Sequence, residues 1–183
     1  MKKIVLSASL LLCASALSAA PVFTLVSPDF NDNALLAKKF AGNTPGNVSC
    51  TGEGISPALG WSSPPALTKS FALTITDPVG AKGLGVDHLV AYNIAPQQTQ
   101  FSQGELAQGK GFTGGKNSIG TQRYAGPCPP AGSGAHHYNF TLIATDLAPD
   151  ALPEGLTRDA LMARLKGHVL GATGLIGRFG NGL

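Results

Sequence analysis

The chain has 183 residues, of which 43% are hydrophobic and 13% are charged, and its 13 basic and 10 acidic residues give a net charge of +3. It contains no basic stripe of the kind that binds nucleic acid. It also lacks a polybasic or amphipathic segment that would form a stable membrane anchor. Composition therefore argues against nucleic acid and a stable membrane anchor as partners.

The first 20 residues have the layout of a secretory signal peptide. Lys2 and Lys3 precede an apolar or small-residue run over 4–12, and mostly small residues follow. The run is too short to span a bilayer as a retained helix. We therefore expect residues 1–20 to be removed from an exported protein that is periplasmic or secreted.

Removal of the signal leaves residues 21–183 as a single domain with a net charge of 11 − 10 = +1, because Lys2 and Lys3 are lost. The exact cleavage position stays open. Ala20 precedes a proline, and Ser18 or Ala19 are alternatives for the last residue of the signal.

Cysteine usage agrees with export. Cys13 lies in the signal and follows Leu12, where a lipid-modified cysteine needs a small residue, so we disfavour a lipoprotein. The exported domain then keeps Cys50 and Cys128, and an even count in an oxidising compartment predicts one disulfide. The alternative is two separate buried thiols.

The 24 Gly and 13 Pro interrupt several short apolar stretches, which is typical of a mainly β protein. We predict a two-sheet antiparallel β-sandwich with a short C-terminal helix. In chain order, a short first strand is expected over 22–26. A second follows over 69–76, where Phe71, Leu73 and Ile75 share one face.

The next strand is predicted over 88–95, with Val90, Tyr92 and Ile94 on one side. The glycine-rich segment 97–135 shows little alternation and is interpreted as mostly a long structured loop, a feature that is often functional.

Alternation returns over 137–146, where Tyr138, Phe140 and Leu142 share a face. A helix is predicted over 156–165 with Thr157 as its N-cap, and 167–171 is interpreted as a final turn and short strand.

Four blocks in this order carry a family resemblance: SPALGWSSPP at 56–65, KSFALTITDP at 69–78, DHLVAYNIA at 87–95, and GPCPP at 126–130 followed by GAHHY at 134–138. They resemble the phosphatidylethanolamine-binding protein family. The GPCPP form and the signal peptide resemble its bacterial branch, the Raf-kinase-inhibitor-like YbhB/YbcL type.

The resemblance implies a Greek-key-like sandwich and an anion pocket. The positions that match the pocket are Asp77, His88, His136 and Tyr138, with Pro127 and Pro129 in the adjoining wall. It also implies a phosphate-bearing or other small anionic ligand, and inhibition or modulation of a protein partner. No cofactor and no metal ligand are implied.

The residues themselves point to the same place. Asp77 ends one predicted strand and His88 begins the next, so a hairpin would bring both to one end of the sandwich. His136 and Tyr138 are two apart, so they face the same side. Imidazole N–H and phenol O–H suit a phosphate oxygen, and Asp77 could hold a histidine in the donating state.

Taken singly, these residues have plainer explanations. His88 could be a surface histidine, Asp77 before Pro78 an ordinary turn residue, and Tyr138 a core ring. Three further aromatic or imidazole residues are not assigned to the site. His137 should point to solvent, His168 has no evident partner, and Trp61 should lie in the core.

The sequence also departs from the family pattern. Val79 stands where a second aspartate is common, and His137 stands where arginine is usual. These changes leave the rim of the pocket less charged.

We therefore expect a binding protein and not an enzyme. A hydrolase that uses Asp77, His88 and His136 as metal ligands or as acid and base is the first alternative. A protein-interaction module with a vestigial pocket is the second. The sequence contains no G-x-S-x-G and no H-E-x-x-H motif. It leaves open whether the protein is a monomer or a homodimer.

Overall fold

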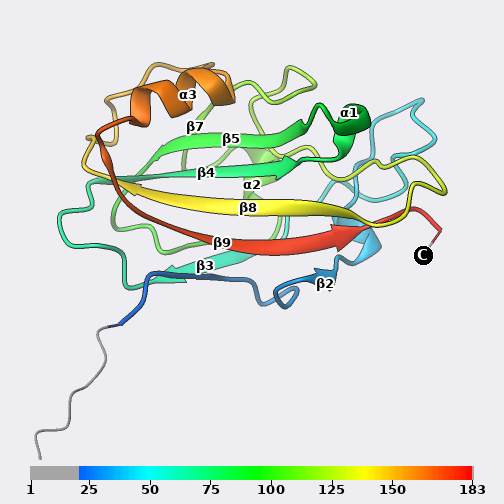
Figure 1. The fold of residues 1–183 in the computed structure, drawn as a ribbon, viewed down its shortest axis with the longest axis horizontal. Coiled ribbons are helices and arrows are strands. Elements are labelled where there is room, and N and C mark those ends of the chain that lie inside the picture. Colours follow the sequence, from blue (N-terminus) through cyan, green and yellow to red (C-terminus); the bar gives the residue numbers. More distant parts are fainter. Residues whose placement is uncertain (1–20, 183) are drawn as a thin grey trace, which may run out of the picture.

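The computed structural model describes residues 21–182, so the expected signal peptide over 1–20 lies outside the described residues. Two β-sheets face each other (Figure 1). The large sheet contains, in spatial order, β2 (Ala34–Leu35), β9 (Val169–Phe179), β8 (His136–Thr145), β4 (Ser70–Asp77), β5 (Val86–Ile94) and β7 (Thr113–Gly114). The small sheet contains β1 (Thr24–Val26), β3 (Leu59–Ser62) and β6 (Gln100–Phe101).

The main core lies between the two sheets. Phe71, Leu73 and Ile75 of β4 are buried there, as their alternation predicts. Trp61 of β3 also lies in this core and packs edge-on against Phe71, with ring centroids 5.5 Å apart. The predicted mainly β sandwich is confirmed, and its strand pairs are antiparallel except for the two-residue pair of β2 with β9.

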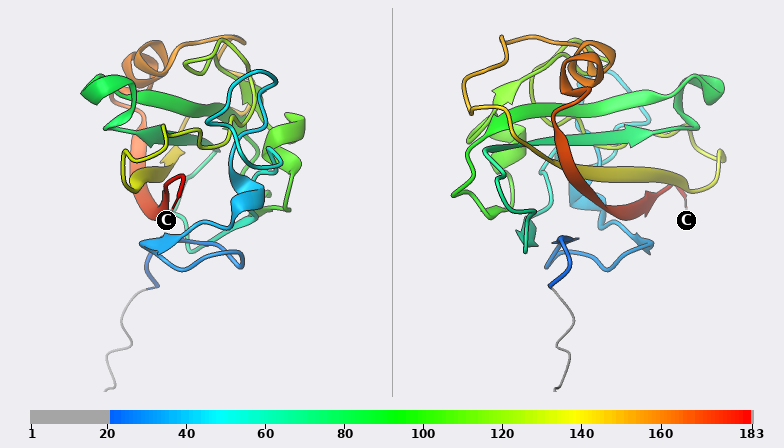
Figure 2. Two further views of the ribbon diagram at one scale, coloured as in Figure 1. Left: turned by 90° about the vertical axis from the view of Figure 1, so that its right-hand side faces the viewer. Right: turned by 60° about the vertical axis from the view of Figure 1, so that its left-hand side comes forward.

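Helix α3 (Arg158–Leu165) covers part of the outer face of the large sheet, as the views in Figure 2 show. Thr157 is its N-cap, as predicted, and its hydroxyl accepts a hydrogen bond of 3.2 Å from the amide of Ala160. The shorter helices are α1 (Gly80–Gly83), α2 (Glu105–Gln108) and the 3-10 turn η1 (Lys38–Phe40). Within residues 21–182, no helix has the length and apolar character needed to span a membrane.

The predicted common face of Val90, Tyr92 and Ile94 is wrong. Val90 and Tyr92 pack under α3, whereas Ile94 is buried between the sheets. The register explains the change, because Ala91 pairs with Leu73 and Ile94 pairs with Phe71, which leaves two residues of β5 opposite one of β4. This β-bulge, with Asn93 at φ 55°, turns the end of β5 over.

The predicted short C-terminal strand is also wrong in length, because β9 runs for 11 residues. The sequence did not indicate the full length of β9, because the strand contains several glycines and glycine is depleted in strands. They are needed for close packing: a Cβ at Gly177 would lie 2.7 Å from Leu36, and one at Gly171 would lie 2.9 Å from Pro65.

The segment 97–135 is structured, as expected, but it is not only loop. It contributes β6, α2 and β7 before it returns to the start of β8. Its last part is tied to the N-terminal region by a disulfide between Cys50 and Cys128, as predicted from the cysteine count.

We expect the disulfide to contribute strongly to stability. Its partners are separated by 78 positions in the sequence, and the chain-entropy model gives a stabilisation of up to about 4–5 kcal/mol for such a loop. Urea unfolding of the C50A/C128A double variant should therefore show a lower free energy of unfolding than the oxidised protein. Thiol labelling of both cysteines in unfolded, unreduced protein would contradict the bridge.

Candidate ligand-binding site

The candidate site lies at the end of the sandwich where β4 ends and β8 begins. The β4–β5 hairpin pairs Asp77 with Val86, so the predicted connection is confirmed. A register shift then leaves His88 as an extra residue between the pairs Thr76–Asp87 and Ile75–Leu89. This bulge turns the His88 ring toward Tyr138 on the inner face, with ring centroids 5.1 Å apart.

Asp77 and His136 form the most direct contact of the site. Nδ1 of His136 lies 2.6 Å from Oδ2 of Asp77, and both side chains are largely buried. The other carboxylate oxygen of Asp77 accepts hydrogen bonds from the amides of Val79 (3.1 Å) and Gly80 (3.0 Å). With three donors on its carboxylate, Asp77 holds His136 in the state that carries a proton on Nδ1.

His88 is held by a different partner. Its Nδ1 lies 2.7 Å from the carbonyl oxygen of Ala125. A carbonyl only accepts, so Nδ1 carries the proton, and Nε2 remains for a ligand. Burial lowers the pKa of His88 from its ordinary value of 6.5, although the Ala125 carbonyl and the Asp77 charge oppose the shift. The ring is therefore neutral at pH 7, with Nε2 as an acceptor.

Tyr138 completes the floor of the site. Its side chain is buried, and burial, reinforced by the charge of Asp77, raises the pKa of its hydroxyl. The phenol thus keeps its proton throughout the physiological pH range and can donate it in a hydrogen bond.

A tightly packed wall closes one side of the site. Gly126 lies so close to η1 that a Cβ there would be 2.5 Å from the carbonyl oxygen of Phe40. The amide of Gly42 donates a hydrogen bond of 2.8 Å to the carbonyl oxygen of Pro127. The hydroxyl of Tyr124 donates another of 2.8 Å to the carbonyl oxygen of Phe40. The Cys50–Cys128 bridge therefore covalently reinforces two segments that already pack against each other.

These elements surround a cavity of about 590 Å³. Its ionisable and hydrogen-bonding walls include Asp77, Asp87, His88, Arg123, His136 and Tyr138. Its apolar walls include Pro45, Val86, Ile119, Pro129 and Pro130. Two carboxylates and one guanidinium therefore line the cavity, and a second guanidinium, that of Arg158, lies 3.8 Å from Oδ1 of Asp87.

The structure brings together five of the six predicted residues at this cavity: Asp77, His88, Pro129, His136 and Tyr138. The sixth, Pro127, is buried behind the wall, where its carbonyl binds Gly42. Their role in binding a ligand stays a prediction.

The structure also places the residues that the sequence analysis did not assign to the site. His137 is exposed on the opposite side of β8 from His136 and Tyr138, as predicted. His168, for which no partner was expected, has Nδ1 2.8 Å from Oδ1 of Asp146. Val79, at the replaced aspartate position, is half exposed and is not among the residues that line the cavity.

Sequence reasoning missed Asp87, Arg123 and Ile119 as lining residues. Asp87 lies beside His88 in its sequence block, which is a signal that could have found it. Arg123 and Ile119 come from the long loop, where no periodicity indicates direction. Among residues 21–182, no cluster of three or more histidine, cysteine or acidic side chains has a metal-binding arrangement.

Comparison with known proteins places this site in context. The family model described as phosphatidylethanolamine-binding protein matches residues 26–180. A UPF0098 protein of Methanothermobacter thermautotrophicus is 38% identical over 144 residues, covering 77% of this chain and 93% of the relative. LppC of Mycobacterium tuberculosis, which is named a lipoprotein, is 38% identical over 164 residues, covering 88% of this chain and 74% of LppC.

Solved structures agree. Escherichia coli YbcL, described as a member of the mammalian PEBP family, superposes with a TM-score of 0.77 at 25% identity, covering 86% of this chain and 98% of YbcL. The PEBP homologue CT736 of Chlamydia trachomatis gives a TM-score of 0.73 at 29% identity, covering 85% of this chain and 95% of CT736.

The neutral, buried state of His88 predicts a pH dependence of stability. Unfolded protein takes up a proton at this residue as the pH falls below about 6.5, whereas the folded protein resists it because the pKa is lowered. The free energy of unfolding should therefore decrease as the pH falls from 6.5 through the folded pKa. Urea unfolding between pH 4 and 8 should show a shallower decrease for H88Q, and an unchanged one for H137Q.

Proposed function

Because the chain belongs to the phosphatidylethanolamine-binding protein family, we propose that its cavity binds a small anion, either phosphate or a phosphate-bearing head group. The observation that carries the proposal is the His136–Asp77 pair at 2.6 Å beside Tyr138 in the cavity. The Asp77 carboxylate accepts Nδ1–H of His136, so the imidazolium form of this ring presents its Nε2–H to the same anion as the O–H of Tyr138.

His88 adds a different requirement. Its Nδ1–H is used by the Ala125 carbonyl, so the neutral ring can only accept a hydrogen bond through Nε2. A ligand that combines anionic oxygens with a donor satisfies both kinds of group. Hydrogen phosphate and phosphate monoesters with an ammonium or hydroxyl group have this combination.

The cavity also has room beyond a single phosphate. Its apolar walls, which include Ile119, Pro129 and Pro130, can cover the carbon atoms of an organic substituent. This favours an organic phosphate over the bare ion, and we propose that the protein binds such a ligand without chemical turnover.

We further propose that the protein acts outside the cytoplasm. The Cys50–Cys128 disulfide is typical of oxidising compartments. The similarity to LppC, which is named a lipoprotein, agrees with export.

The binding proposal predicts which histidine matters. Phosphate and phosphoethanolamine should shift the NMR signals of His136 and His88, with dissociation constants on the order of tens of micromolar to millimolar. H136A should weaken binding at least about tenfold, because charged hydrogen bonds are stronger than neutral ones. H137A is the matched control, since His137 lies on the other face. Equal losses in both variants would contradict this site.

The same titration has a predicted pH dependence. An anion binds an imidazolium more tightly than an imidazole, so affinity should fall as the pH rises across the range in which the histidine that contacts the anion loses its proton. Phosphate changes its own charge over this range, so the trend should be measured with sulfate, whose charge is constant. Sulfate affinity that is flat or rises with pH would show that no protonated histidine takes part.

Catalysis can be tested on the same samples. We expect no phosphatase or esterase turnover above background with p-nitrophenyl phosphate and p-nitrophenyl acetate. Turnover that survives repurification and is lost in H136A, but not in H137A, would contradict the binding proposal and would identify the protein as a hydrolase.

A further inference from the structure

The side chain of Asn181 connects the two segments that carry the bridged cysteines. Its Nδ2 donates hydrogen bonds to the carbonyl oxygen of Ser49 at 2.8 Å and to that of Pro129 at 2.6 Å. Its Oδ1 accepts a hydrogen bond of 2.8 Å from the hydroxyl of Thr51. Ser49 and Thr51 are the two neighbours of the first bridged cysteine, and Pro129 directly follows the second. One carboxamide therefore joins the same two segments as the disulfide.

These partners use both donors of a primary amide. The NH2 group has two hydrogens, and each is directed to a backbone carbonyl, which can only accept. The carboxamide oxygen receives the hydroxyl hydrogen of Thr51. A carboxylate in this position would lack both donors, and an alanine would make none of the three hydrogen bonds. The surroundings of Asn181 therefore require an amide.

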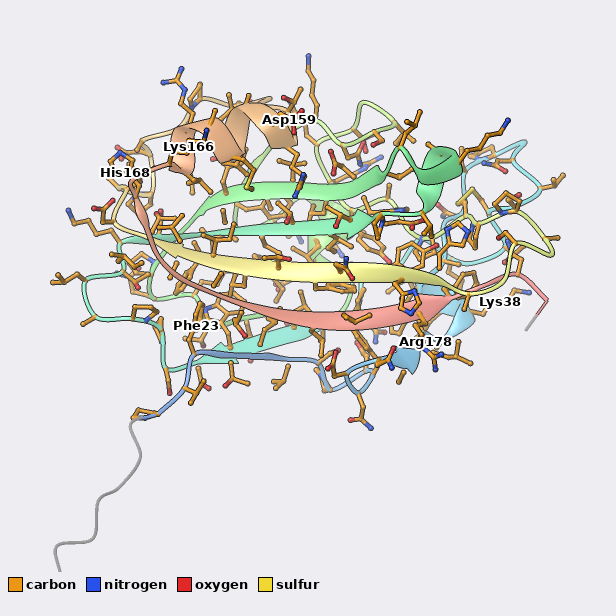
Figure 3. All side chains as sticks on the ribbon, viewed as in Figure 1. Phe23, Lys38, Asp159, Lys166, His168 and Arg178 are labelled. Carbon is orange, nitrogen blue, oxygen red and sulfur yellow. A yellow bond between two sulfur atoms is a disulfide. The ribbon has the colours of Figure 1, made fainter. Side chains whose placement is uncertain are left out.

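Asn181 lies at the same end of the sandwich as the cavity. It follows β9, which ends opposite His136, and Figure 3 shows Arg178 of β9 at this end of the sheet. The residues after β9 lie beside the segments 42–52 and 126–130 (Figure 1). Both segments contribute to the walls of the cavity, whereas Asn181 is not among its lining residues. Asn181 therefore contacts these walls from outside the cavity.

We propose that Asn181 is a positioning residue for the two cysteines. Its hydrogen bonds keep Cys50 and Cys128 adjacent in the reduced protein, and they keep this wall of the cavity in place before the disulfide forms. A small disulfide such as oxidised glutathione is the oxidant: one cysteine thiolate attacks it, and the other thiolate then displaces glutathione from the mixed disulfide. The protein loses two electrons and two protons, and the oxidant becomes two thiols.

The disulfide and the Asn181 carboxamide should support each other, because each forms only when the same two segments are adjacent. By linkage, the factor by which Asn181 favours the disulfide equals the factor by which the disulfide favours the Asn181 contacts. A third connection, the hydrogen bond from the amide of Gly42 to the carbonyl of Pro127, joins the same segments without involving Asn181. It can therefore report whether the segments remain together.

The thiol–disulfide equilibrium of the folded domain, residues 21–183, tests the positioning role. The protein is equilibrated with reduced and oxidised glutathione, and its free thiols are trapped by alkylation. N181A should lower the equilibrium constant for bridge formation at least about tenfold, because three hydrogen bonds that favour the juxtaposition are lost. T51V removes one of the three and should lower the constant less.

The matched control is N139A, which removes a carboxamide from β8, where Asn139 pairs with Ile176 of β9. It should leave the equilibrium constant unchanged. A constant for N181A within about twofold of the wild-type value, or an equal loss in N139A, would overturn the proposal.

Amide hydrogen exchange at Gly42, followed by NMR, tests whether Asn181 keeps the wall in place without the disulfide. In the oxidised protein, N181A should leave this exchange nearly unchanged, because the disulfide still joins the segments. In the reduced protein, N181A should accelerate it at least about tenfold relative to the reduced wild type. The amide of Leu73, in the central strand β4, should exchange equally in all four samples, which checks that each is folded.

Equal acceleration in oxidised and reduced N181A, or none in the reduced variant, would show that Asn181 only attaches the residues after β9 to the surface, and would overturn the proposal. Both tests use the protein without any ligand, so they do not depend on the proposed anion binding.

Discussion

The pairing of β4 with β8 at the centre of the large sheet is the constraint on which the site depends. Its register sets Ile75 opposite Phe140 and Thr76 opposite Asn139, and buries alternate residues of both strands between the sheets. The same alternation places Asp77, His136 and Tyr138 on the inner face at the strand ends. A slip of one residue would expose the core side chains and would exchange His136 for His137. The hydrophobic core therefore also fixes the ionisable groups of the cavity.

The bulges of β5 add what regular pairing cannot provide. In an uninterrupted strand, His88 would lie on the same face as Val90 and Tyr92, beneath α3 and away from Asp77. The extra residue at His88 turns its ring to the inner face, and the second bulge at Asn93 returns Ile94 to the core. Packing by α3 and formation of the cavity thus make opposite demands on one strand, which two local irregularities satisfy.

The parts of this structure that follow from periodicity were predictable, and the parts that depend on contacts between distant segments were not. Alternation located β4 and β8, and it placed His136 and Tyr138 together while directing His137 outward. Alternation did not predict the length of β9. There, Gly171 and Gly177 pack closely against Pro65 and Leu36, which lie more than 100 positions earlier in the chain. Alternation also could not separate Pro129, which lines the cavity, from Pro127, which binds Gly42 behind the wall.

If the cavity binds an anion as proposed, its hydrogen-bonding groups limit which anions fit. The carboxylates of Asp77 and Asp87 and the guanidinium of Arg123 line the cavity, and Arg158 lies 3.8 Å from Asp87. His88 is kept neutral by burial and held by Ala125, and it presents an acceptor at the same place. Sulfate would leave that acceptor unpaired, which costs free energy in a buried site. A phosphate that retains one proton, or an ester with its own donor, pairs with both kinds of group. Under the proposed function, the placement of protons therefore decides which anion fits more than net charge does.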